Sequence, residues 1–276
     1  MTELNPGPET DIGPAVKQAF IQTDPNLKAQ AVKQIYADLA DGRFDHVTAQ
    51  DMPLRPGRPE RPQLLPPRDV PRRRITSGPA GRIALLHAIA HIELNAIDLA
   101  LDMVGRVWSY SLPFDFVRDW MSVAHDEARH FSLLQNRLTE MQSHYGALDA
   151  HDGLWEAAVR TKDDLAGRLA IAPLVLEARG LDVTPQLITK MSEAGDDASA
   201  AILNIIMEEE VSHVATGKRW FDYVCGCDRS DPISHWQSLV RRYFNGSLKP
   251  PFNIDARTAA RFSAAFYAPL AEEHRH

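Results

Sequence analysis

Apolar residues recur at the spacing of a helix along four long stretches of the chain. A period of about 3.6 residues holds over 80–108, 113–145, 161–180 and 196–225, so each stretch is predicted to be a helix. Glycines at or near the ends of these stretches predict where the helices stop: Gly105, Gly146, Gly180 and Gly226. No stretch alternates apolar and polar residues strongly enough to predict a strand. The pattern predicts an all-α fold with a four-helix core.

Shorter helices are predicted around this core. Residues 14–39 have helical spacing with one break, since Thr23 and Asp24 precede Pro25 and suit a new helix start. Thr184 before Pro185 predicts another start. Further helices are predicted over 154–160, 231–244 and 255–267. We therefore expect three regions: N-terminal helices with an arm (1–79), the four-helix bundle (80–226) and a C-terminal helical extension packed on the bundle (227–276).

The arm, residues 53–79, contains eight prolines and seven arginines. Proline lacks an amide hydrogen and fixes φ, so the arm is predicted to be extended and similar to polyproline. Its arginines could bind RNA or an acidic partner. The alternative, which we favour, is that the arm lies over the chain's own fold with its arginines solvated or paired.

The composition is that of an ordinary globular protein. The chain has 276 residues, of which 44% are apolar and 24% charged, which excludes collagen-like and wholly disordered classes. A net charge of −7 opposes binding of a polyanion by the whole surface. Two cysteines, Cys225 and Cys227, cannot form a disulfide framework, which favours a reducing compartment. The polar N-terminus does not resemble a secretory signal, and no apolar run suits a membrane span. We expect a cytoplasmic protein that does not associate with a membrane.

Each of the four long stretches has a glutamate on its apolar face. Glu93, for example, shares its helix face with Ile89 and Ile97. No lysine or arginine lies on these faces, and an ionised carboxylate in an apolar interior costs several kcal/mol unless a positive charge meets it. A bound pair of cations is the simplest compensation for the four glutamates, which are Glu93, Glu127, Glu177 and Glu210.

Two of these glutamates have a histidine three residues later. Glu127 pairs with His130 and Glu210 with His213, a spacing at which both side chains can reach one metal centre. Glu209 could replace Glu210 as a ligand if the helix were wound differently there, although the face of Glu210 is more apolar. The predicted metal ligands are therefore Glu93, Glu127, His130, Glu177, Glu210 and His213.

The ordered set of Glu, Glu-x-x-His, Glu and Glu-x-x-His resembles the ferritin-like superfamily of carboxylate-bridged di-iron proteins. Within it, the chain looks like an uncharacterised bacterial family known only as a domain of unknown function. The resemblance rests on 87–102, 124–134, 173–181 and 205–217 and covers about 80–226.

The resemblance also implies a role for each ligand. Glu93 and Glu177 would be terminal ligands, and Glu127 and Glu210 would bridge two iron ions, with manganese as the alternative metal. The two histidines would each cap one ion. Such a site leaves positions open for O₂.

Other residues could carry chemistry, but in each case we favour a structural role. His87 and His91 are spaced for a metal, yet they point away from Glu93, which indicates a packed or solvated pair. We expect Cys225 and Cys227 to be inert. The aromatic residues that could serve electron transfer are expected to belong to the core; they are Trp108, Tyr110, Trp120 and Tyr223.

The favoured function is activation of O₂ by a di-iron oxygenase or oxidase that oxidises or hydroxylates a small molecule, with an unidentified electron donor. The alternatives are a ferritin-type storage protein and a non-catalytic scaffold with a vestigial site. The 80-residue N-terminal extension does not suit a ferritin shell, whereas a homodimer is compatible with the chain.

Overall fold

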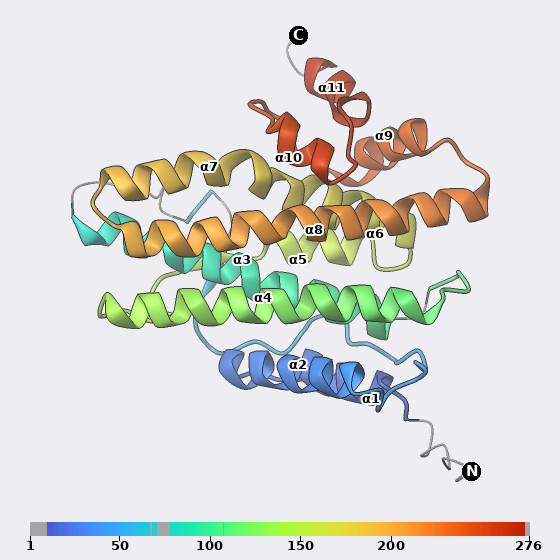
Figure 1. The fold of residues 1–276 in the computed structure, drawn as a ribbon, viewed down its shortest axis with the longest axis horizontal. Coiled ribbons are helices and arrows are strands. Elements are labelled where there is room, and N and C mark those ends of the chain that lie inside the picture. Colours follow the sequence, from blue (N-terminus) through green and yellow to red (C-terminus); the bar gives the residue numbers. More distant parts are fainter. Residues whose placement is uncertain (1–9, 67, 71–77, 107, 274–276) are drawn as a thin grey trace, which may run out of the picture. The chain divides into compact units, whose positions relative to one another are not determined.

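The computed structural model describes residues 10–66, 68–70, 78–106 and 108–273, and these are mostly helical (Figure 1). The all-α prediction is confirmed. The helices are α1 (Gly13–Ile21), α2 (Pro25–Ala40), α3 (Pro79–Gly105), α4 (Phe114–Glu140), α5 (Gly153–Arg160), α6 (Leu165–Ile171), the π-helix η1 (Ala172–Glu177), α7 (Ala178–Glu193), α8 (Asp197–Asp228), α9 (Pro232–Tyr243), α10 (Ile254–Ala259) and α11 (Ala264–Glu273).

The expectation of no strand is wrong in one place. β1 (Leu64–Leu65) pairs in parallel with β2 (Ala150–His151), so the arm contributes a strand. Each strand has only two residues, which is too short for an alternating pattern to be visible in the sequence.

The predicted stop at Gly180 and start at Thr184 are also wrong, because α7 runs through both positions. A proline inside a helix removes the hydrogen bond to the carbonyl four residues earlier. For Pro185 that carbonyl belongs to Leu181, and the Asn253 side chain donates to it instead at 3.2 Å. A tertiary contact thus replaces the missing backbone bond.

Three other helix ends differ from prediction for one shared reason. α4 ends at Glu140, α8 continues past Gly226, and the helix predicted over 255–267 is divided into α10 and α11. At each of these ends a residue other than glycine has a positive φ: 59° at Gln142, 53° at Arg229 and 58° at Arg261. The next amide donates to the carbonyl five residues earlier, as in a Schellman motif. Because these positions are not glycines, glycine in the sequence does not mark where these helices end.

Contacts divide the chain into two compact units. The first comprises Met1–Glu60 and Glu93–Ser132, and the second comprises Arg61–Ile92 and Leu133–His276. α3 and α4 each contribute residues to both units. The three predicted regions, 1–79, 80–226 and 227–276, stay a prediction.

The first unit packs α1 against α2 and holds a buried group of charges. The Lys28 ammonium donates to the carboxylate of Asp98 and to the carbonyls of Phe20 (3.2 Å) and Gly57 (3.0 Å). Arg58 also pairs with Asp98, so this part of the arm lies over the chain's own fold, as we favoured. The predicted arm residues 67 and 71–77 lie outside the described residues.

The second unit has α7 and α8 side by side, with α6 and η1 also packed on α8 (Figure 1). Gly217 of α8 permits a close approach, since a Cβ there would lie 2.3 Å from the Cβ of Pro173 in η1. α9 packs on α6 and on α11.

Among the described residues one helix, α3, is long and apolar enough to cross a membrane by length and composition alone. However, 72% of its most apolar window is buried inside the protein. The core helix of a folded domain meets the same criterion of length and composition, so these two properties of α3 are weak evidence for a membrane span.

We expect Asp98→Asn to lower the free energy of unfolding by about 3 kcal/mol, because it leaves the Lys28 ammonium buried without its carboxylate. Asp115→Asn, which breaks the exposed pair with Arg118, should cost less than about 1 kcal/mol. Urea unfolding of both variants measures the difference, and equal losses would contradict the importance of the buried group.

Gly217→Ala should destabilise the chain by about 1–3 kcal/mol, because its methyl group would collide with Pro173. Gly226→Ala is the matched control in the same helix: no atom lies within 4 Å of its added Cβ, and it should be stabilising by up to about 1 kcal/mol. Thermal unfolding of both variants tests whether the two substitutions change the stability in opposite directions. Stabilisation by both substitutions would mean that η1 and α8 are not held this closely.

Candidate metal centre

Three predicted ligands converge within the first unit. Glu93 lies on α3, and Glu127 and His130 lie one turn apart on α4. His130 Nδ1 is 3.2 Å from Glu93 Oε2 and 3.4 Å from Glu127 Oε2. Glu127 and His130 are fully buried and Glu93 is 3% exposed, and each offers a ligand atom within 4.8 Å of the others. We call these three residues the first cluster.

The helix register explains why these polar groups face inward. Glu93 is followed on its own face by Ile97 and Ala100, and Glu127 is flanked by Ala124 and Phe131, all of which are buried. The apolar stripes of α3 and α4 therefore carry the carboxylates into the interior, as the sequence pattern predicts.

Burial and proximity shift the pKa values of the first cluster. Burial raises the pKa of Glu93 well above its usual value, the charge of Glu127 raises it further, and the hydrogen bond from His130 only partly offsets this. Burial alone would lower the pKa of His130, but its hydrogen bonds to Glu127 and Glu93 and their charges raise it to about 11. In the metal-free chain an imidazolium thus compensates the carboxylates, and it must lose its proton before a metal ion can take its place.

The second unit holds the other three predicted ligands. Glu210 and His213 are buried on α8, and His213 Nδ1 lies 3.8 Å from Glu210 Oε2. Glu209 is half-buried, and α8 is regular along this stretch, so the different winding that would favour Glu209 is not found there. Glu177 is half-buried and is the last residue of η1.

The π-helix that carries Glu177 was not predicted, although its cause is visible in the sequence. Pro173 cannot donate a helical hydrogen bond, which loosens the turn. Next to this position, the carbonyl of Ala170 accepts from the indole nitrogen of Trp236 in α9, at 3.2 Å. Such π segments are frequent at functional sites. The contact of Pro173 with Gly217 holds η1 against α8.

Of the two structural roles that we expected for the pair His87 and His91, packed or solvated, the structure has the packed one. Both residues are buried. The His87 Nε2 atom accepts from the amide of Gly146 at 2.9 Å, and His91 Nδ1 lies 2.8 Å from the hydroxyl of Tyr145. His91 Nε2 also lies 3.1 Å from the carbonyl of His151. These contacts fasten the segment after α4 to α3 within the second unit.

The remaining candidates have ordinary environments. Cys225 is buried and Cys227 exposed, neither forms a disulfide, and burial raises the pKa of Cys225. Trp120 is buried in the core and the indole of Trp108 donates to a backbone carbonyl, whereas Tyr223 is 37% exposed and so does not belong to the core.

The donor groups suit a first-row metal ion. Carboxylate oxygen and imidazole nitrogen are ligands that iron and manganese accept, and no thiolate lies in the first cluster. The first cluster therefore fits a metal ion by donor type and by convergence.

The comparisons with known proteins identify a family without a described activity. An uncharacterized protein from Haemophilus influenzae is 37% identical over 259 residues, which cover 90% of this chain and 89% of that protein. No solved structure matches. The family described as "Protein of unknown function (DUF455)" matches residues 21–268. Because this match spans most of the chain, the protein belongs to the DUF455 family.

Proposed function

We propose that this chain is a ferritin-like four-helix protein with a two-metal centre, which activates O₂ to oxidise or hydroxylate a small molecule. Iron is the favoured metal and manganese the alternative. The ligands would be the six predicted residues. Glu93 and Glu177 would be terminal, Glu127 and Glu210 would bridge, and His130 and His213 would each bind one ion.

The convergence of the first cluster is the observation that carries this proposal. Two carboxylates and an imidazole with ligand atoms within 4.8 Å of one another are costly in an apolar interior, and a bound cation would offset that cost. The second unit supplies the matching set, one glutamate and one Glu-x-x-His pair. Ferritin-like di-iron centres use this combination from four helices.

The residues of the chain would have separate tasks around such a centre. Bound iron would supply the electrons that reduce O₂. The buried carboxylates would neutralise the charge of the ions, and His130 would release its proton when a metal ion binds. The apolar residues beside them, such as Phe131 and Ala124, would exclude water from the reaction.

Metal content is the first test of the proposal. Protein purified without oxygen and loaded with Fe(II) should hold two ions per chain and consume O₂. His130→Ala should lower metal affinity at least tenfold, since even residues that only support a ligand contribute about that much. The chain should stay folded, because the apolar faces hold α4 in place.

His125→Ala is the matched control in the same helix. His125 stacks on Tyr36 with ring centroids 4.4 Å apart, and it is not a proposed ligand. It should keep the wild-type metal content. Equal metal content in the two variants would overturn the role of His130, and wild-type protein without bound metal would overturn the proposal.

The stability of the metal-free chain should fall as the pH rises from 7 to 9. A group whose pKa is higher in the folded state stabilises the fold below its unfolded pKa, and this contribution is lost as the pH rises through the folded pKa. For His130 that window runs from 6.5 to about 11, and for Glu93 it begins at 4.5. Metal affinity should rise over the same range, because protons compete with the metal ion.

The urea unfolding midpoints of chelator-treated protein at pH 7 and at pH 9 measure the fall in stability. His130→Ala should show a smaller fall than the wild type. The imidazolium would not be the compensating charge if the metal-free wild type gained stability with rising pH. The same would follow if the stability of His130→Ala fell as much as that of the wild type.

A further inference from the structure

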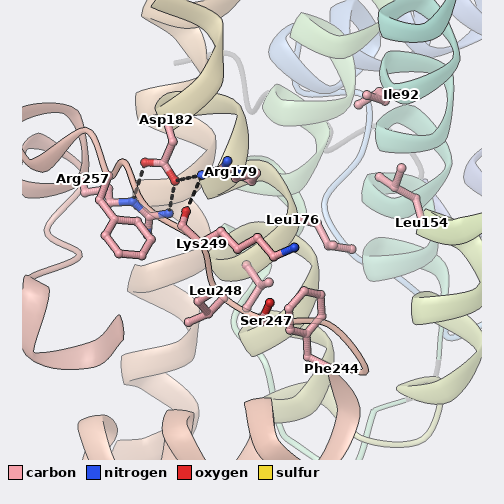
Figure 2. Close-up of a pocket in the computed structure, with 12 residues that line it drawn as sticks. Ile92, Leu154, Leu176, Arg179, Asp182, Phe244, Ser247, Leu248, Lys249 and Arg257 are labelled. Carbon is pink, nitrogen blue, oxygen red and sulfur yellow. Dashed lines mark hydrogen bonds and ion pairs between the residues drawn. The ribbon is translucent and has the colours of Figure 1, made fainter. Parts of the chain in front are cut away.

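The second unit contains a cavity of about 240 Å³ beside the π-helix (Figure 2). Its apolar wall includes Val175 and Leu176, the two residues that precede Glu177, and Leu154 of α5. Cavities that hold drug-sized ligands usually exceed about 300 Å³, so this one suits a smaller molecule.

Four charged side chains line this cavity. Three basic side chains and one carboxylate line it: Arg179, Lys249, Arg257 and Asp182. Arg257 donates to both oxygens of Asp182, at 2.9 and 2.7 Å, and is itself only 3% exposed. Arg179 also lies 3.4 Å from this carboxylate. The single negative charge is therefore held by the two arginines.

Lys249 is placed differently from the arginines. Figure 2 shows its side chain extending toward Leu176, away from Asp182. Among the described residues, no carboxylate lies within ion-pair distance of its ammonium. Lys249 is exposed at the mouth of the cavity, so water solvates its ammonium in the empty site and the ammonium is available to an anion whose body lies against the apolar wall.

The backbone around Lys249 is held in place. Its carbonyl accepts from Arg179 at 2.6 Å, and the carbonyl of Pro251 also accepts from Arg179 at 3.3 Å. Asp182 accepts from the amide of Asn253 at 2.9 Å. The buried ion pair thus fixes the segment between α9 and α10, which carries Lys249 and the polar side chain of Ser247 to the cavity.

We propose that this cavity binds a small amphipathic anion, a carboxylic acid with an unbranched apolar body. The carboxylate would bind the ammonium of Lys249 and the hydroxyl of Ser247. The apolar body would lie against Leu154 and Leu176. The residues of the cavity support this binding site without reference to a metal. That its occupant is the molecule oxidised at the metal centre rests on the proposed function; the two are connected because the lining residues Val175 and Leu176 directly precede Glu177 in the chain.

Octanoate is the probe, titrated into the chelator-treated full chain by calorimetry. It should bind, and Lys249→Gln should raise its Kd about tenfold, because a charge-assisted hydrogen bond is lost. Lys190→Gln, an exposed lysine on α7, is the matched control and should leave the Kd unchanged. Octylamine, which has the same body and the opposite charge, should bind at least tenfold more weakly than octanoate.

Leu154→Trp provides an independent test, since the larger side chain should fill the cavity and abolish octanoate binding while the thermal unfolding curve stays cooperative. Full octanoate binding by Lys249→Gln or by Leu154→Trp would overturn the proposal. So would equal binding of octylamine, or no binding to the wild type at millimolar concentration. Metal content is measured separately: octanoate binding to a chain that takes up no metal would refute the proposed function and leave the binding site standing.

Discussion

The imidazole of His130 lies between the carboxylates of Glu93 and Glu127 in an apolar interior, and the chemistry proposed for this protein depends on that contact. Each ionised group in such an interior costs several kcal/mol, so the carboxylates need a positive charge close by. In the metal-free chain a proton on His130 supplies it, which explains why its pKa rises to about 11. In the proposed function, a bound metal ion would replace that proton as the charge that compensates the carboxylates.

In the second unit, the proposed ligand Glu177 lies at the end of an irregular helical turn. Pro173 interrupts the regular helix, the indole of Trp236 donates to the nearby carbonyl of Ala170, and Gly217 lets α8 approach the turn. Glu177 is the last residue of η1, so these contacts hold its backbone in place. Residues of the same π-helix line the cavity with Lys249, so the proposed substrate and metal sites would both include η1.

Much of the fold could be predicted from the sequence because long apolar stripes at helical spacing leave little choice of structure. The same argument correctly predicted that Glu93, Glu127 and Glu210 are buried. It failed where a tertiary contact replaces a local rule. Asn253 lets α7 continue through Pro185, and Gln142, Arg229 and Arg261 end helices in a conformation that usually selects glycine. The cavity was missed because it is lined by residues that are far apart in the chain. The π-helix was missed because Pro173 alone indicates an interrupted helix and does not specify the type of turn.

The central claim is that Glu93, Glu127 and His130 share one two-metal centre with Glu177, Glu210 and His213. X-ray absorption at the iron edge of anaerobically loaded protein tests it most directly. The account predicts scattering from a second iron at about 3.5–4 Å, together with oxygen and nitrogen neighbours at about 2 Å. Iron bound without a second iron at that distance, or iron with sulfur neighbours, would contradict it.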